Sequence, residues 1–163
     1  MKFKTDWEKR YPICIEVAGE QAMFSRPDTG SERMSYPCPT RMAAKAIFET
    51  VVFMEQVIVI PLEVRVCRPL QYMALVTNSN HSPLRKSSLR TDDNPMQIRE
   101  NTLVDVCYQI IGIVMNNPDE EVLSRIPEKH RGNNHAHAYH DRFKRYLRQG
   151  RSLQQPCLGR NNM

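Results

Sequence analysis

The 163-residue sequence contains few of the features that mark redox, metal or membrane proteins. Its five cysteines stand far apart with no Cys-x-x-Cys pair, so we expect reduced, mostly buried thiols rather than disulfides or a zinc site. The most apolar stretch, residues 51–60, is interrupted by Glu55 and Gln56 and has half of the ~20 residues that a membrane-spanning helix needs. The first ten residues are charged and lack the apolar region of a secretory signal. These absences predict a cytoplasmic protein that does not enter a membrane.

Glycine is also scarce, and the six glycines form neither a Gly-x-Gly-x-x-Gly fingerprint nor a Walker motif. A nucleotide cofactor is therefore not expected. No Gly-x-Ser-x-Gly elbow frames a serine nucleophile, which disfavours hydrolases of that class. His135, His137 and His140, with Asp141, have a spacing that could ligate a metal, but a His-x-His without a fourth ligand is more typical of exposed surface. We expect neither a metal nor another cofactor.

Positive charge is concentrated near the end of the sequence. The formal net charge is +5, yet residues 129–160 hold eight Lys and Arg side chains against a single acid, Asp141. Lys and Arg gain affinity for a polyanion by releasing its condensed counterions, so the basic segment 129–163 predicts a phosphate-binding surface. The alternative is the solvated face of a basic helix.

The apolar pattern alternates between strands and helices. β-branched and apolar runs predict strands at residues 11–17, 57–60, 62–66 and 103–115, with Pro61 splitting the middle pair. Apolar residues three and four apart predict helices at 41–53, capped by Thr40, at 118–126 and at 139–148. Polar, proline-rich composition predicts loops at 25–39 and 77–96, and the longer one is a candidate to contact RNA or a partner protein.

This order of elements predicts a single α+β domain over residues 1–163 with a ferredoxin-like (RRM-like) fold, in which an antiparallel sheet carries helices on one face. Folds of this type commonly bind single-stranded RNA.

Several blocks, in order along the chain, resemble one known family. They are Val17-Ala-Gly-Glu-Gln-Ala-Met-Phe-Ser-Arg-Pro27, Glu32-Arg-Met-Ser-Tyr36, Ala43-Ala-Lys-Ala-Ile-Phe-Glu49, Val64-Arg-Val-Cys-Arg-Pro-Leu70, Arg99-Glu-Asn-Thr-Leu103, Asp105-Val-Cys-Tyr108, Arg142-Phe-Lys-Arg-Tyr-Leu-Arg-Gln-Gly150 and Gln155-Pro-Cys-Leu-Gly159. They are similar to motifs of the CRISPR-associated RAMP family called Cas-five (Cas5), in its subtype I-C form. The resemblance covers residues 11–159.

The resemblance implies a RAMP domain that holds the repeat-derived 5′ handle of a CRISPR RNA at one end of a Cascade complex, beside backbone RAMP subunits and a large subunit. It also implies RNA-binding residues. Those at matching or nearby basic and aromatic positions are Arg26, Arg33, Tyr36, Arg41, Lys45, Lys129, His130, Arg142, Lys144, Arg145 and Arg148.

In subtype I-C the same protein usually cuts precursor CRISPR RNA without metal. Such cleavage needs a proton acceptor for the attacking 2′-hydroxyl, a proton donor for the leaving oxygen and a cation. The matching positions here hold Val52, Ala138 and Tyr139, so the expected first-helix group and lysine are absent. The remaining catalytic candidates are Tyr139, His140 and His137.

Three functions stay open at this point. The first is a handle-binding Cascade subunit with weak or no endoribonuclease activity. The second is a stand-alone, virus-borne mimic that occupies the subunit's place and inhibits assembly of the effector, which is an anti-CRISPR role. The third is an active, metal-independent processing endoribonuclease with a rearranged site.

Overall fold

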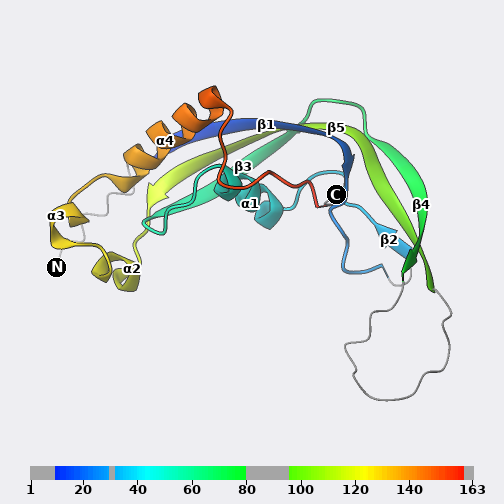
Figure 1. Cartoon of the computed structure of the whole chain (residues 1–163), viewed down its shortest axis with the longest axis horizontal. Helices are drawn as coiled ribbons and strands as arrows, with labels where there is room; N and C mark the ends of the chain where they lie inside the picture. Colours follow the sequence, from blue (N-terminus) through cyan, green and yellow to red (C-terminus); the bar gives the residue numbers. More distant parts are fainter. Residues whose placement is uncertain (1–9, 30–31, 80–95, 160–163) are drawn as a thin grey trace, which may run out of the picture.

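The computed structural model describes residues 10–29, 32–79 and 96–159, which form a five-stranded sheet with helices beside it (Figure 1). The longest strand, β5 (Met96–Asn116), is the axis of this sheet, and every other strand pairs with it. These strands are β1 (Tyr11–Ala22), β2 (Glu32–Met34), β3 (Val57–Val66) and β4 (Gln71–Ser79).

Strand β5 divides the sheet into two halves. Along its second half it lies between β1 and β3, both antiparallel, so that Val114 pairs with Tyr11 on one side and Val59 on the other. Along its first half it lies between β2, which is parallel, and β4, which is antiparallel. Asp105 separates the two halves and has a φ of 50°, a left-handed conformation that interrupts regular strand geometry.

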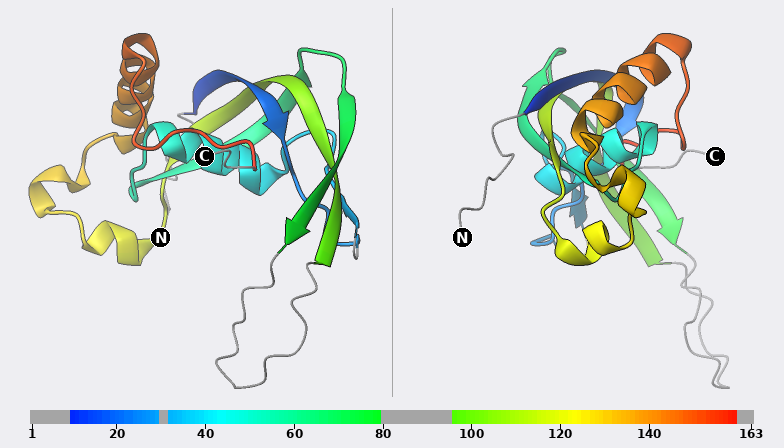
Figure 2. Two further views of the ribbon diagram at one scale, coloured as in Figure 1. Left: turned by 45° about the vertical axis from the view of Figure 1, so that its right-hand side comes forward. Right: turned by 90° about the vertical axis from the view of Figure 1, so that its left-hand side faces the viewer.

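The helices are α1 (Arg41–Val51), α2 (Glu120–Ser124), α3 (Glu128–Arg131) and α4 (His135–Gln149). Helices α1 and α4 pack on the half of the sheet built from β1, β3 and β5, which we call the covered half (Figure 2). The other half, built from β2, β4 and the start of β5, we call the open half. Helix α1 begins at Thr40, whose side-chain oxygen accepts a hydrogen bond from the Ala43 amide at 3.3 Å.

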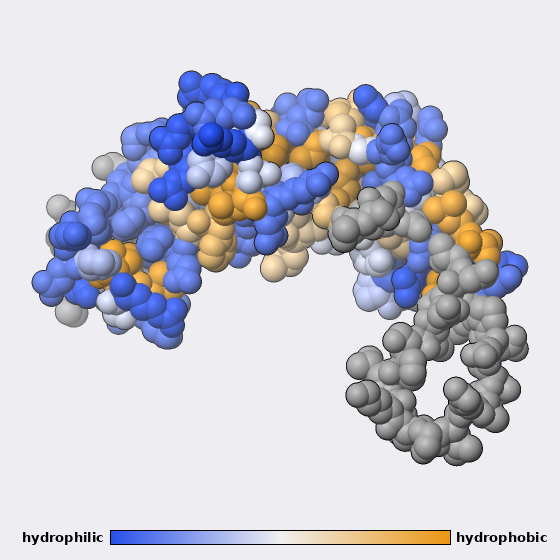
Figure 3. All heavy atoms as spheres, viewed as in Figure 1, coloured by the Kyte–Doolittle hydropathy of each residue, from blue (hydrophilic) through white to orange (hydrophobic). Residues whose placement is uncertain are grey.

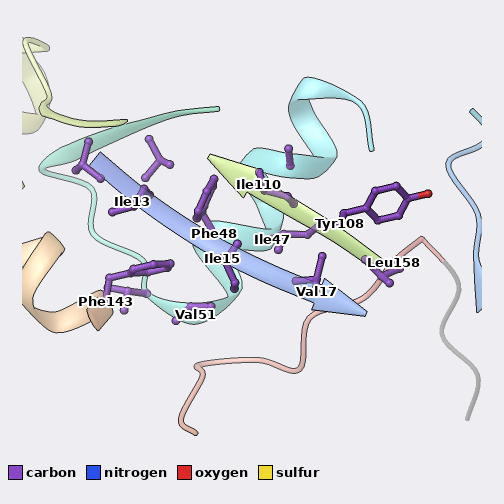
Figure 4. Packing of buried hydrophobic residues seen from close by; sticks show 14 of the residues in the cluster. Ile13, Ile15, Val17, Ile47, Phe48, Val51, Tyr108, Ile110, Phe143 and Leu158 are labelled. Carbon is purple, nitrogen blue, oxygen red and sulfur yellow. The ribbon is translucent and has the colours of Figure 1, made fainter. Parts of the chain in front are cut away.

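The hydrophobic core fills the space between the covered half and these two helices (Figure 4). Strand β1 alternates strictly: Ile13, Ile15 and Val17 are buried, and the residues between them are exposed. This period of two places one face of the strand against the helices. The rings of Phe48 on α1 and Phe143 on α4 lie 5.8 Å apart and join the two helices over the sheet.

Gly112 on β5 leaves space for the neighbouring strand and for a ring of α1. A Cβ atom there would lie 2.9 Å from the carbonyl oxygen of Ile60 and 3.2 Å from the ring of Phe48. On the neighbouring strand the pairing register shifts between Pro61 and Glu63. The missing side chain therefore makes room both for the irregularity in β3 and for the aromatic ring above it.

The predicted α+β, ferredoxin-like fold with helices against the sheet is confirmed. Some predicted boundaries were wrong. Strand β3 runs through Pro61, which is tolerated because β3 pairs on one side only among the described residues and Pro61 needs no ladder partner on the other. Strand β4 was not predicted from the sequence, and its last residues lie within the predicted loop 77–96. Residues 80–95 of that loop lie outside the described residues. Helix α4 begins four residues earlier than predicted, at His135.

The expectation of mostly buried cysteines was also wrong. All five are free thiols, but Cys14, Cys67 and Cys157 are exposed and only Cys107 is buried. Two of the exposed thiols lie on the sheet face that points away from the core, a placement that cysteine spacing alone does not reveal. No helix within the described residues is long and apolar enough to cross a membrane.

Candidate nucleic-acid interface

Helix α4 presents a row of cations to solvent. Its buried side consists of Ala136, Tyr139 and Phe143, which pack into the core. The remaining surface carries four exposed cations, Arg142, Lys144, Arg145 and Arg148. Among the described residues none of these four forms an ion pair. Unpaired cations along one helix are the arrangement that attracts a phosphate backbone.

Both ends of α4 are fixed by capping residues. At its start the side-chain oxygen of Asn134 accepts a hydrogen bond from the His137 amide at 3.1 Å. At its end Gly150 adopts a left-handed conformation with φ 62°, and its amide and that of Arg151 donate to carbonyls of the last turn. The cations are therefore presented by a helix of defined length and orientation.

A group of titratable side chains gathers at the start of α4, and we call it the histidine cluster: Tyr11, His137, His140 and Asp141. The Tyr11 ring centroid lies 5.4 Å from that of His137 and 5.6 Å from that of His140. The Asp141 carboxylate lies 3.6 Å from Nδ1 of His137 and 3.4 Å from Nδ1 of His140. His137 is open to solvent, whereas the His140 side chain is 14% exposed. Two imidazoles beside one carboxylate can exchange protons without a metal.

Two positions considered for catalysis lie in the core instead. Tyr139 is 1% exposed, and its hydroxyl donates to the Phe48 carbonyl oxygen at 3.5 Å. Burial raises the pKa of Tyr139 well above its ordinary value, so the hydroxyl stays protonated at neutral pH. Val52 follows the last residue of α1 and is also 1% exposed. Neither side chain has a surface with which to touch RNA.

A second aromatic and basic group lies where the loop after β1 returns to β2, and we call it the tyrosine cluster: Arg26, Tyr36 and Tyr72. The guanidinium of Arg26 lies 5.8 Å from the ring centroid of Tyr36. Its ion pair with Asp28, at 2.5 Å, raises the pKa of Arg26, and the nearby hydroxyls of Tyr36 and Tyr72 add smaller contributions. Tyr72, on β4, is 49% exposed. Tyr36 is half-buried and packs against the core. Tyrosine rings with an open face beside an arginine can stack on unpaired bases.

The remaining predicted RNA-binding residues are scattered. Arg41 is exposed at the start of α1, and Lys45 on the same helix lies 3.5 Å from Glu49. Lys129 and His130 are exposed on α3. Arg33, on β2, pairs with Glu100 at 3.2 Å, which reduces its availability for a phosphate.

Apart from Arg41 and Lys45 on α1, the predicted binding residues lie toward two ends of the molecule. The cations of α4 and those of α3 lie toward one end, whereas the tyrosine cluster and Arg33 lie beside β2 and β4 at the other (Figure 1). In Figure 3 hydrophilic residues cover α4, and hydrophobic side chains gather over β4. The α4 end is suited to a phosphate backbone, and the tyrosine end is suited to bases.

Sequence reasoning missed Tyr11 and Tyr72. Tyr11 meets α4 only through the folded chain, because the residue it bonds, Asn134, is 123 positions away. Tyr72 lies on a strand that the sequence analysis did not predict. The β-favouring residues around it, Leu75, Val76 and Thr77, were the signal that could have placed it on a strand. Among the described residues, no group of three or more His, Cys, Asp or Glu side chains is placed to hold a metal ion.

Comparison with known proteins shows what the chain is similar to. No protein-family model matches the sequence. A curated protein from Thermus thermophilus, named CRISPR pre-crRNA endoribonuclease Cas5d, is 27% identical over 147 residues, which are 90% of this chain and 59% of that protein. The chain is a Cas5-like protein. It spans about three fifths of the length of this relative.

Solved structures share the fold of this Cas5-like chain. A crystal structure of a CRISPR-associated protein matches 93% of this chain and 63% of its own, with 24% identity and a TM-score of 0.61. A chain from a CRISPR RNA-guided surveillance complex matches 93% of this chain and 58% of its own, with 15% identity and a TM-score of 0.51. These likenesses place the observed sheet and helices within a fold that CRISPR-associated proteins use.

Proposed function

We propose that this Cas5-like chain binds the 5′ handle of a CRISPR RNA as a subunit of a type I-C, Cascade-like complex, beside backbone RAMP subunits and a large subunit. The observation that carries the proposal is the row of unpaired cations on α4. Two neighbours in the comparisons support it, since one is named a pre-crRNA endoribonuclease and the other belongs to an RNA-guided surveillance complex.

The two ends of the molecule are suited to different parts of a single-stranded RNA. Phosphates are drawn to the cations of α4, and each contact releases counterions. Bases splayed from the strand can stack on Tyr36 and Tyr72, whose neighbour Arg26 adds a positive charge. An RNA strand that contacted both ends would lie across the sheet. Its phosphates would then be bound by α4 and its bases by the tyrosine cluster.

Binding to a repeat-derived RNA at several salt concentrations tests the proposal. Replacing Arg142, Lys144, Arg145 and Arg148 with Gln should weaken binding and lower the salt slope by about 3, since each single-strand contact contributes ~0.7. The matched control replaces Arg65, Arg68, Arg99 and Arg125, which are exposed but sit in ion pairs elsewhere, and so removes the same net charge. Equal losses in both variants would contradict an interface on α4.

Copurification distinguishes a working subunit from a mimic. Coexpressed with the other subunits of a type I-C complex, a working subunit yields an assembly that binds target DNA. An inhibitor that mimics the subunit yields an assembly that does not.

A second candidate function, metal-independent RNA cleavage, is favoured by the histidine cluster. Its two imidazoles share one carboxylate, and the Tyr11 ring holds both in place. One imidazole can accept the proton of a 2′-hydroxyl while the other donates a proton to the leaving 5′-oxygen. The adjacent cations of α4 can offset the charge of the pentavalent phosphate.

Cleavage of repeat RNA in EDTA tests this second function. We expect one cut, lost in His137→Ala and His140→Ala and retained in His130→Ala, which removes an exposed histidine of α3. A single 2′-deoxy nucleotide before the cut should block it, because the attacking hydroxyl is then absent. Cleavage that persists in both cluster variants would exclude the histidine cluster as the site.

A further inference from the structure

Three thiols lie on or beside the sheet face that points away from α1 and α4. Cys14 stands between two core-facing isoleucines of β1, and Cys107 stands between Val106 and Tyr108, which also face the core. Because side chains alternate along a strand, both thiols point to the opposite face. Cys67 follows the last residue of β3 and is exposed.

Cys67 and Cys107 are cross-strand neighbours. The preceding residue of β3, Val66, pairs with Tyr108, so the same register sets Cys67 opposite Cys107. The Cys67 amide donates to the Cys107 carbonyl oxygen at 2.8 Å, which fixes the two backbones. Residues opposed in this way have Cα atoms about 5.5 Å apart, within the ~4.4–6.8 Å range of disulfides.

The two thiols differ in exposure. The pKa of the Cys107 thiol is raised, chiefly by burial and also by Glu16 and the neighbouring Cys67. Cys107 is 7% exposed, whereas Cys67 is open to solvent. A small oxidant therefore reaches the exposed Cys67 sulfur before it reaches the buried Cys107 sulfur. The next thiol on this face, Cys14, pairs with Ile111, four residues further along β5 than Cys107.

We propose that Cys67 and Cys107 form a redox-modification site whose substrate is hydrogen peroxide and whose product is an intramolecular disulfide. The Cys67 sulfur attacks one peroxide oxygen, so that the O–O bond breaks, an S–O bond forms and water leaves. The Cys107 sulfur then attacks the Cys67 sulfur, and the hydroxyl departs as a second water with the Cys107 proton. Two thiols are oxidised and one peroxide is reduced to two waters.

The disulfide would lock the junction between the two halves of the sheet. Cys67 begins the turn that joins β3 to β4, and the next residue, Arg68, forms an ion pair with Asp105 at the interruption of β5. Oxidation would tie this turn to β5 two residues from Asp105. Neither cysteine belongs to α4 or to the tyrosine cluster, so the proposal stands independently of RNA binding.

Peptide mapping after oxidation tests the site. The full chain is treated with hydrogen peroxide, remaining thiols are alkylated, and the protein is digested with trypsin without reduction. We expect peptide 66–85, which contains Cys67 because trypsin does not cut the Arg68–Pro69 bond, to be joined to the peptide that contains Cys107, as the dominant cross-link in monomeric protein. The cross-link should persist in Cys14→Ser and be completely lost in Cys67→Ser, a substitution at an exposed position.

Thermal unfolding gives a second readout. The oxidised chain should unfold at a higher temperature than the reduced chain, and a thiol reductant or Cys67→Ser should abolish the difference. The proposal is overturned if Cys67 is recovered as sulfinic or sulfonic acid, or in disulfides between chains, while Cys107 stays reduced.

Discussion

Asn134 donates a hydrogen bond from Nδ2 to the hydroxyl oxygen of Tyr11 at 2.7 Å, across 123 residues of sequence. The same side chain caps α4 through its oxygen. One residue therefore sets where the cation-bearing helix starts and ties that start to the first strand. This connection places the Tyr11 ring in the histidine cluster, where it contacts the rings of both His137 and His140.

A double-mutant cycle tests this connection. Asn134→Ala should lower the free energy of unfolding by about 1–2 kcal/mol, because it removes both the cap and the bond to Tyr11. Tyr11→Phe should cost about 1 kcal/mol, and the pair should show a coupling of ~0.5–1.5 kcal/mol in urea unfolding. Asn133→Ala, on the exposed side of the same loop, serves as the control and should change stability by less than ~0.5 kcal/mol. Strictly additive effects would contradict the role of the Asn134–Tyr11 bond.

Tyr139 should behave as a core residue. Tyr139→Phe keeps the ring and removes only a long hydrogen bond, so we expect a stability change within about 1 kcal/mol and unchanged RNA binding and cleavage. Tyr139→Ala should cost about 3–5 kcal/mol through the cavity it leaves. Loss of RNA cleavage in a folded Tyr139→Phe protein would show that the buried hydroxyl does take part in the reaction.

Deprotonation of its buried tyrosines should destabilise the folded protein at alkaline pH. Burial raises the pKa of Tyr108 to about 12 and also raises that of Tyr139. A group that keeps its proton longer in the folded state stabilises that state below its unfolded pKa of ~10, and the contribution is lost as pH rises from there through the folded value. Urea midpoints measured between pH ~8 and ~11 should fall steeply above ~10. Tyr139→Phe should flatten this fall, and an identical pH profile in that variant would contradict the assignment.

Tyr72 should contribute to RNA affinity by stacking. Tyr72→Ala should weaken binding of repeat RNA by ~1–3 kcal/mol while leaving the salt slope unchanged, because stacking releases no counterions. Tyr72→Phe keeps the ring and serves as the matched control, with affinity close to that of the unaltered chain. If both variants bind as tightly as the unaltered protein, the tyrosine cluster does not contact bases.

The sequence predicted those parts of the fold that depend on local pattern. The alternation in β1 and the apolar repeat of α1 are readable from a dozen residues, and both elements are present. Strand β4 was missed because it is exposed along most of its length and so lacks the buried half of an alternating pattern. Its place in the sheet comes from pairing with β5 in tertiary structure.

The sequence indicated which basic residues belong to the candidate site, but not how the side chains around them are arranged in space. The basic segment of the sequence coincides with the exposed cations of α4, because charge is a property of the sequence itself. Spacing alone could not show that Tyr139 points into the core and His137 out of it, since α4 begins earlier than predicted and its buried face is set by packing against Phe48. The meeting of Tyr11 with α4 is a long-range contact that no local pattern encodes.

Photocrosslinking of a repeat-derived RNA tests the central claim most directly. RNA carrying 4-thiouridine at successive positions is bound to the full chain at moderate salt, irradiated, and the linked peptides are identified by mass spectrometry. The account predicts cross-links to peptides of α4 from the handle positions and to the peptide containing Tyr36 or Tyr72 from neighbouring bases, with loss of the α4 cross-links when its four cations are replaced by Gln. Specific binding with cross-links confined to the sheet face that carries Cys14 and Glu16, and none on α4, would contradict it.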